Sequence, residues 1–473
     1  MKKKRKKIQI QLLLLFVLLL PFSFRHIFNY ENIVELEFFK ESVSLSFYLF
    51  DAVFLLLLWE WIVQISGGAV IPSFLSLLKK FRVNFWKNWP FWLLVCFLAW
   101  SILYVSQHPF PALYLSARLF QGIAVFIIAG KLLAQKAEYF QKVAYVIFIS
   151  GVFQAIMGLG QFLFQKSLGL VILGESKIAP DILGVAKFEL AGEKFIRAYG
   201  TFPHPNLFGA FLFLSLVCGL SFLFFQQRKI PFSFNFPGKN KLKWIKISKE
   251  KLSLIHYSAG LLLIFLGILV SYSRSVWLVS FVITLLIFWK YFKQFSREYL
   301  RENLFKKTKI IFVIILVVLL GAGVYQAVSP RLCLDDCAGD QSFSLRQKYT
   351  HFALEKIDDY DYFGLGSGNF VLHMNNEKPF DLKEWEIQPV HNLYLLILVE
   401  IGLVGFLFLF FVVFSYLKRF NKISGIWNKT GFYALLGFLI LGFFDHYFWT
   451  TPQGIIIFWL ALALIAGSCK MEE

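Results

Sequence analysis

The run HNLYLLILVEIGLVGFLFLFFVVFSY, residues 391–416, is apolar almost throughout and contains a single charged residue, Glu400. The hydrocarbon core of a bilayer is about 30 Å thick, and an α-helix needs about 20 apolar residues to cross it. The run is therefore predicted to span a membrane. Of all 473 residues, 58% are hydrophobic and 16% are charged, which is more apolar surface than one soluble core can bury.

Eleven further runs of similar character are bounded by charged residues or by Gly and Pro. The predicted spans are 8–24, 43–65, 90–106, 112–131, 142–165, 206–226, 253–271, 275–292, 309–328, 391–416, 431–447 and 453–468. The first run resembles a signal peptide, but the PFSFRHIF that follows it offers no small-residue cleavage site, so we expect a retained span. These runs predict an all-α integral membrane protein with about 12 spans in one polytopic domain, 1–473.

The net charge of +19 is unevenly distributed, and its distribution predicts the orientation. If the basic head MKKKRKK is cytoplasmic, the inner tails and loops hold 33 Lys and Arg against 6 Asp and Glu, and all other residues hold 15 against 23. Cytoplasmic flanks of membrane proteins are rich in Lys and Arg, so both termini are predicted to be cytoplasmic. The dispersed basic residues favour contacts with anionic lipid over nucleic-acid binding.

Two outer segments, 166–205 and 329–390, are much longer than the other outer turns. The second is predicted to carry one or two short amphipathic helices, the first near 343–357, followed by a Gly-rich turn. The turn GLGSGNF (364–370) lacks the Lys-Ser/Thr of a phosphate loop and is read as a loop only. In the same segment, Cys333 and Cys337 could form a small disulfide. A metal site at these cysteines is the less favoured alternative.

Three arginines fall on the predicted outer face: Arg197, Arg274 in the turn SYSRSVW, and Arg346. Each one alone could be a solvated or lipid-facing side chain. Together they suit a diphosphate, which guanidinium groups bind through paired hydrogen bonds. Within RAYGTFPHPN (197–206), Asn206 is a candidate helix N-cap and His204 is read as structural, with a possible supporting role.

His391, followed by Asn392, opens the span 391–416. The positive end of the helix dipole and nearby arginines would lower the pKa of its imidazole, leaving a neutral base that could accept a proton, although a capping role at the interface competes. Gly402 and Gly405 follow at helical spacing and would allow close packing. Four ionisable residues lie inside predicted spans, without assignable partners: Asp51, Glu60, Arg118 and Glu400.

These motifs together resemble the O-antigen ligase and O-antigen polymerase superfamily of bacterial envelope enzymes. The family pattern of His-Asn, nine residues, Gly, two residues, Gly is matched from His391-Asn392 to Gly402 and Gly405. SYSRSVW, SLRQKY around Arg346 and RAYGTFPHPN match its other motifs in order, so the resemblance covers about 195–410, the expected catalytic region.

The resemblance implies a glycosyltransferase that needs neither a metal nor another cofactor. It would transfer a glycan from undecaprenyl diphosphate to a glycan, lipid or protein acceptor, such as the lipid A-core of lipopolysaccharide, on the extracytoplasmic face of a bacterial inner membrane. Arg274 and Arg346, with Arg197 as a third, would bind the diphosphate, and His391 would act as the catalytic base. A ligase is favoured over an O-antigen or exopolysaccharide polymerase, and a lipid-linked glycan transporter is a weaker alternative because no repeated halves are visible.

Overall fold

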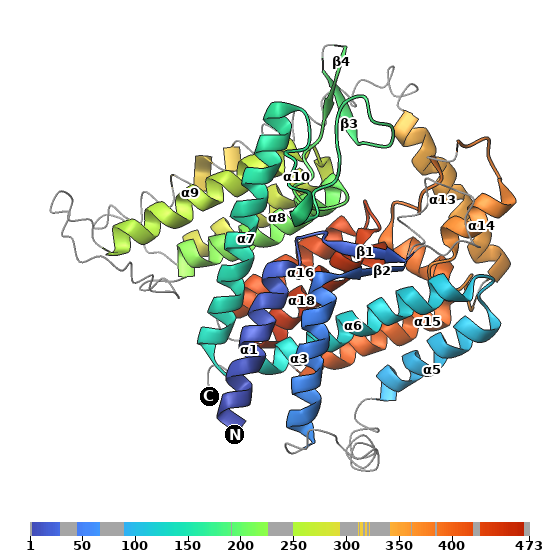
Figure 1. Cartoon of the computed structure of the whole chain (residues 1–473), viewed down its shortest axis with the longest axis horizontal. Coiled ribbons are helices and arrows are strands. Elements are labelled where there is room, and N and C mark those ends of the chain that lie inside the picture. Colours follow the sequence, from blue (N-terminus) through green and yellow to red (C-terminus); the bar gives the residue numbers. More distant parts are fainter. Residues whose placement is uncertain are drawn as a thin grey trace.

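The computed structural model describes residues 2–28, 45–66, 89–225 except 191, 249–293, scattered positions between 311 and 321, 341–419 except 361, 384 and 385, and 426–467. These residues are mostly helical (Figure 1). The helices are α1 (Lys2–Leu19), α3 (Leu49–Ile65), α5 (Trp89–Tyr104), α6 (Pro109–Leu133), α7 (Ala137–Phe164), α8 (Pro205–Phe225), α9 (Lys249–Val270), α10 (Arg274–Lys293), α13 (Gln341–Tyr360), α14 (Phe370–Glu377), α15 (Leu393–Arg419), α16 (Ile426–Leu441), α17 (Tyr447–Thr450) and α18 (Pro452–Gly467), with a 3-10 turn at Val171–Leu173.

In the described ranges, two short antiparallel hairpins interrupt the helices, and the sequence did not predict them. β1 (Arg25–Phe28) pairs with β2 (Leu45–Tyr48), with Arg25 opposite Tyr48. β3 (Lys187–Leu190) pairs with β4 (Glu193–Ile196) inside the long outer segment 166–205. Both hairpins lie in connections between helices, so the described part of the chain is still predominantly helical.

Among the described residues, four helices are long and apolar enough to cross a membrane by length and composition: Pro109–Leu133, Ala137–Phe164, Pro205–Phe224 and Leu393–Ser415. Other described helices overlap seven more predicted spans, although several of them are shorter. Most of the predicted span 309–328, and both Cys333 and Cys337, lie outside the described residues. An all-α membrane protein is thus supported, and the number of twelve spans remains a prediction.

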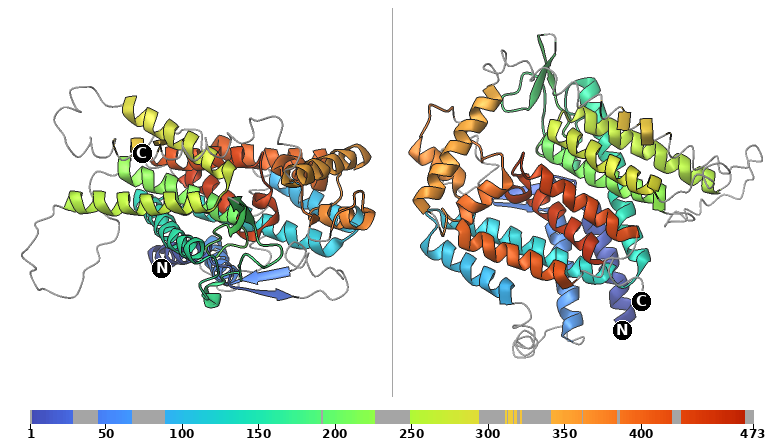
Figure 2. Two further views of the ribbon diagram at one scale, coloured as in Figure 1. Left: turned by 90° about the horizontal axis from the view of Figure 1, so that it is seen from above. Right: turned by 180° about the vertical axis from the view of Figure 1, so that it is seen from behind.

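The helices pack in a continuous series that brings distant parts of the chain together. α7, α8 and α9 contact one another, α8 and α10 contact α16, and α16 contacts α18, which lies along α6. At the far end, α5 and the outer helix α13 contact α15, so α13 and α14 lie across the molecule from α9 (Figures 1 and 2). α13 contains the predicted amphipathic helix near 343–357, and α14 is the second.

The ionisable residues inside predicted spans have partners. Arg118 of α6 donates to Asp51 of α3 at 2.5 Å and to Gln121 at 2.7 Å, and both members of this ion pair are buried. Glu60 pairs with Arg5 of α1 at 3.1 Å in a more accessible position. These pairs tie α3 to its neighbours α6 and α1.

Replacing Asp51 with Ala is expected to destabilise the protein by about 3–5 kcal/mol, because it leaves the Arg118 charge buried without its carboxylate. Glu60→Ala is the matched control, since the Arg5–Glu60 pair is about a quarter exposed and such pairs contribute about 0–1 kcal/mol. Unfolding of each variant in mixed detergent measures the difference. Equal losses for the two variants would contradict the assignment of Asp51–Arg118 as a buried structural pair.

Candidate functional site

Two buried glutamines of α7 hold the stretch RAYGTFPHPN in place. Gln161 Oε1 accepts hydrogen bonds from the N–H groups of Tyr199 at 3.0 Å and Gly200 at 2.8 Å. Gln154 Oε1 accepts from Thr201 N at 2.9 Å. Gly200 has φ of +59°, a left-handed conformation that strongly favours glycine, which explains its place in the motif. The loop is therefore fixed against α7 immediately before α8 begins.

This fixed loop brings Arg197 to the turn that carries Arg274. Arg197 Nε donates to Ser271 O at 2.8 Å, and Ala198 N donates to Val270 O at 3.0 Å. Arg274 is the first residue of α10 and is exposed, as is Arg346 on α13. Both interact electrostatically with Arg197. The three predicted arginines, from three separate segments, thus converge on one region.

Asn206 has a different role from the one predicted. α8 begins one residue earlier, at Pro205, so Asn206 lies in the first turn and is not the N-cap. Its side-chain oxygen accepts a hydrogen bond from Arg197, and its amide donates to Asp445 at 2.5 Å. Proline suits the first helical position because its fixed φ matches the helix and it has no N–H to satisfy there. Because the side chain of Asn206 does not cap the helix, it can join Arg197 to the buried carboxylate of Asp445.

The start of α15 positions His391. Asn392 Oδ1 accepts hydrogen bonds from Tyr394 N and Leu395 N, both at 3.0 Å, so Asn392 is the N-cap of this helix. Leu393 N donates to Gly442 O at 2.7 Å, which joins this end of α15 to the end of α16. The residues that follow α16 consequently lie beside His391.

His391, Asp445 and His446 form the centre of the site. The rings of His391 and His446 meet edge to face with centroids 5.1 Å apart, and Tyr349 of α13 stacks on His391 at 5.9 Å. His446 Nδ1 lies 2.8 Å from Thr450 Oγ1. Asp445 is buried, the two histidines are half-buried, and His391 Nδ1 has no hydrogen-bond partner among the described residues. A continuous polar path runs from Arg197 through Asn206 to this cluster.

The electrostatics of the cluster favour a neutral histidine beside a carboxylate. Burial lowers the pKa of His391, and His446 and Arg346 lower it further, against the opposing effect of Asp445. Burial would raise the pKa of Asp445, but the histidines and the His446 N–H hold it below its usual value. Burial also lowers the pKa of Arg197 to about 10, so this guanidinium remains charged at neutral pH. The site can therefore accept a proton at His391 and bind an anion at the arginines.

The sequence predicted that Gly402 belongs to a regular helical stripe. The structure contradicts this prediction. Gly402 has φ of +63° and interrupts α15, and a Cβ there would lie 2.3 Å from Tyr362 O. The Gly-rich turn replaces the interrupted helical bonds: Leu365 N donates to Val399 O at 2.9 Å and Gly366 N to Glu400 O at 2.8 Å. The glycine at this position thus allows the turn to pack against the broken helix. Close packing does hold at Gly405, where a Cβ would lie 2.5 Å from the ring of Phe97.

The same cluster meets the elementary requirement for holding a metal ion. His391, Asp445 and His446 each offer a ligand atom, and these atoms lie within 4.8 Å of one another. Two histidines and a carboxylate are a common ligand set for divalent transition metals. However, both oxygens of Asp445 already accept hydrogen bonds, from Asn206 Nδ2 and from His446 N. Metal-independence therefore stays a prediction, which a chelator can test.

The sequence located the arginines and His391 but missed Asp445 and His446. Both were placed inside the predicted span 431–447, whereas α16 ends at Leu441 and the pair lies in the turn beyond it. A charged residue beside a histidine in the apolar stretch GFFDHYF was the available signal. Of the supporting residues, Asn392 caps α15, while His204 is exposed and accepts a hydrogen bond at Nδ1 from Asn206 N at 3.2 Å.

Residues 259–410 match the protein family described as O-antigen ligase. This finding confirms the resemblance to that superfamily over about a third of the chain, including Arg274, Arg346, His391 and Asn392. Arg197, His204, Asp445 and His446 lie outside the matched residues. No curated protein matches this chain.

Proposed function

We propose that this membrane protein, whose residues 259–410 match the O-antigen ligase family, transfers a glycan from undecaprenyl diphosphate to an acceptor hydroxyl. The observation that carries the proposal is the meeting of His391, whose pKa is lowered and whose Nδ1 has no hydrogen-bond partner among the described residues, with a region of three arginines, linked through Asp445 and Asn206. A base and an anion-binding region are the two components that this reaction needs.

The reaction forms a bond between the acceptor oxygen and the anomeric carbon while the bond from that carbon to the diphosphate oxygen breaks. The acceptor proton passes to His391, and Asp445 stabilises the positive charge that develops in the histidine cluster. The electron pair leaves with the undecaprenyl diphosphate, whose growing negative charge Arg274, Arg346 and Arg197 stabilise. Direct displacement inverts the anomeric centre, so a product of retained configuration would contradict this step.

An apolar pocket beside the cluster suits the polyprenyl chain of the donor. It lies among α6, α15, α16, α17 and α18, and its wall includes Leu393 and Tyr394, close to His391 in the chain, together with Trp449. Bulky apolar and aromatic side chains form the remainder of the wall. A chain bound there would have its diphosphate near the start of α15.

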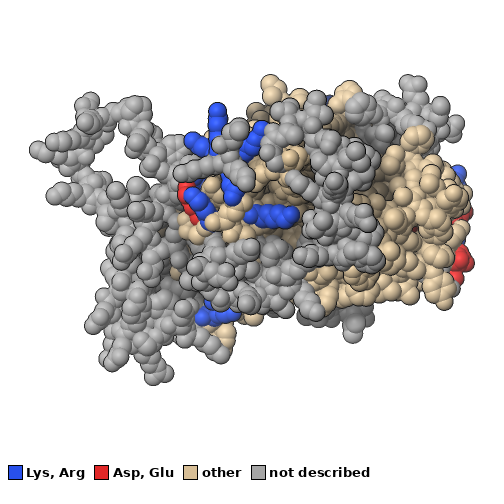
Figure 3. Space-filling view, turned by 90° about the horizontal axis from the view of Figure 1, so that it is seen from below, with Lys and Arg blue, Asp and Glu red and all other residues tan. Residues whose placement is uncertain are grey.

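We propose that the protein lies in a bacterial inner membrane, with both termini cytoplasmic and the site on the outer face. Basic side chains support this orientation, because Lys and Arg gather on the face seen from below (Figure 3), the side on which α1 begins (Figure 1). Such a face suits the anionic inner leaflet.

A ligase and a polymerase would use the same donor and differ only in the acceptor. We favour a ligase because the His-Asn-Gly-Gly pattern is of the ligase type. The test is purified protein in liposomes with an undecaprenyl-diphosphate glycan and, in separate reactions, lipid A-core, a second lipid-linked glycan or a protein acceptor. The reactions contain EDTA because the proposal needs no metal. Product formation with released undecaprenyl diphosphate supports it, whereas movement of the donor across the bilayer without transfer would indicate a transporter.

The transfer rate is expected to stay nearly constant as the pH falls from 7.5 through 6.5, the ordinary pKa of histidine. Only the neutral form of His391 can accept the proton, and a lowered pKa keeps that form populated to more acidic pH. The rate is therefore lost only below the lowered pKa. Single-turnover rates at saturating donor check this, and a fall centred near pH 6.5 would contradict the role given to His391.

A further inference from the structure

Glu400 is a buried ionisable residue that the proposed transfer does not use. It lies inside the apolar helix α15, two residues before the break at Gly402, and is 3% exposed. Within the described ranges it forms no ion pair, and its carboxylate is held by hydrogen bonds instead. A charged side chain inside a membrane span is costly and rare, so its presence there indicates a role.

The carboxylate of Glu400 joins three elements at the break in α15. Its Oε2 accepts hydrogen bonds from Gly368 N in the Gly-rich turn and from Trp449 Nε1 in α17, both at 2.7 Å. A hydrogen bond to an ionised acceptor is roughly twice as strong as one between neutral groups. Trp449 is also buried, so water does not offer its N–H an alternative partner. Glu400 therefore fixes α17 against α15.

α17 determines the direction of the His446 ring. His446 is the N-cap of this helix, and its Nδ1 lies 2.8 Å from Oγ1 of Thr450, the last helical residue. Trp449 N donates to His446 O at 2.9 Å. A helix of four residues is too short to be stable by itself, so its place depends on its tertiary contacts. The bond from Trp449 to Glu400 is such a contact.

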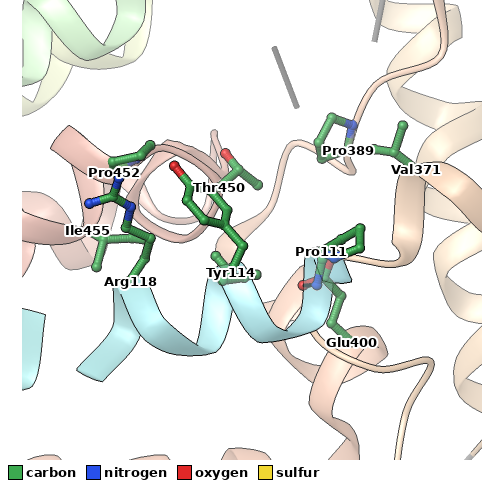
Figure 4. Close-up of a pocket in the computed structure, with 11 residues that line it drawn as sticks. Pro111, Tyr114, Arg118, Val371, Pro389, Glu400, Thr450, Pro452 and Ile455 are labelled. Carbon is green, nitrogen blue, oxygen red and sulfur yellow. Dashed lines mark hydrogen bonds between the residues drawn. The ribbon is translucent and has the colours of Figure 1, made fainter. Parts of the chain in front are cut away.

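The anchored helix places His446 beside the other members of the cluster. Glu400 and Thr450 line the same narrow space beside α6, one from α15 and one from α17 (Figure 4). On the other edge of the His446 ring, Nε2 lies 3.8 Å from Asp445 Oδ1, and the ring meets that of His391 edge to face. A shift of α17 would therefore move His446 relative to both groups.

We propose that Glu400 is a positioning residue, which holds the His446 ring against Asp445 and His391 through its hydrogen bond to Trp449. The inference rests on the glycan transfer proposed above, in which Glu400 contacts neither substrate. A displacement of about 1 Å at a reacting group can lower a rate by about 10²-fold, so a buried anchor of this kind contributes to the rate without taking part in the chemistry.

The first test measures the geometry of the cluster without transfer. Full-length protein in detergent is treated with diethyl pyrocarbonate, which acylates neutral imidazole, and mass spectrometry follows the modification of His446 and of the exposed His351. Glu400→Leu, which suits the apolar span but accepts no hydrogen bond, is expected to raise the His446 rate by about tenfold and to leave His351 unchanged. An unchanged His446 rate, or equal rises at both histidines, overturns the proposal.

Three further variants isolate the hydrogen bond. Trp449→Phe keeps an aromatic ring but removes the N–H, so it should raise the His446 rate as Glu400→Leu does. Glu400→Gln keeps an acceptor oxygen and should retain most of the protection. The matched control is Trp277→Phe, which removes another buried N–H, donated to Ile268 O at 2.8 Å. A rise of the same size in this control would show that the loss of any buried bond loosens the cluster, and would overturn the proposal.

The second test uses the kinetics of transfer. Glu400→Leu and Trp449→Phe are each expected to lower kcat by about tenfold, and the double variant should lose no more than Glu400→Leu alone, because both changes remove the same bond. For Glu400→Leu the donor KM and the acceptor KM should stay within about twofold of the wild-type values. Losses that multiply, or an unchanged kcat in Glu400→Leu, overturn the inference. Absence of transfer by the wild type would instead contradict the proposed function, and the modification of His446 would still decide whether Glu400 positions it.

Discussion

Replacing His391 with Ala is expected to lower the transfer rate by about 10²–10⁴-fold, the usual contribution of a general base. His391 is a neutral, half-buried imidazole whose Nδ1 has no hydrogen-bond partner in the described part of the chain, and Asp445 and His446 adjoin it. Alanine removes the proton acceptor and leaves the arginine region intact, so donor affinity should change little. Single-turnover transfer in liposomes measures the rate, and the intact donor should accumulate.

The matched control is His351→Ala, at an exposed histidine of the same outer segment that meets Phe380 edge to face and lies outside the cluster. It should retain wild-type rate. Asp445→Asn is expected to slow transfer as well, because it removes the charge that stabilises the protonated cluster. Wild-type activity in His391→Ala would eliminate this residue as the base, and loss confined to His446→Ala would assign the role to its neighbour.

The parts of the site that the sequence predicted are those with a local signature. Arg274 and His391 each stand at the boundary of an apolar run, where a charged or titratable side chain is visible against its surroundings. The helix near 343–357 was likewise visible from its alternating polar and aromatic residues, and α13 contains it. Helix periodicity and boundary residues are local properties, so they can be read from one sequence.

The parts that were missed depend on contacts between distant segments. Asp445 joins the site only because Leu393 bonds to Gly442, which brings the end of α16 to the start of α15. Gly402 looked like one position of a helical stripe, yet the backbone of a turn forty residues earlier, at Tyr362, occupies the space beside it and requires a positive φ. The partners Asp51 and Arg118 are similarly far apart in the chain, and no periodic pattern relates them.

Replacing Arg274 or Arg346 with Ala is expected to lower transfer by about 10²–10³-fold, the scale seen when one preorganised charge-stabilising group is removed. Both are exposed, and each interacts with Arg197 in the region where we propose that the leaving diphosphate gains charge. If they bind the donor before it reacts, as proposed, the donor KM should rise while the acceptor KM stays near the wild-type value.

The lysine variants test whether geometry matters beyond charge. Arg274→Lys and Arg346→Lys keep the positive charge but cannot form the paired hydrogen bonds of a guanidinium, so only part of the activity should return. Lys348→Ala is the matched control, since Lys348 lies two residues from Arg346 on α13 and packs on Phe380 instead of facing the cluster. If Lys348→Ala and Arg346→Ala lost activity equally, the loss would reflect the general positive charge of α13. If instead only the two arginine substitutions lowered the transfer rate, and lysine did not fully restore it at either position, the result would indicate that planar guanidinium donors bind the diphosphate directly.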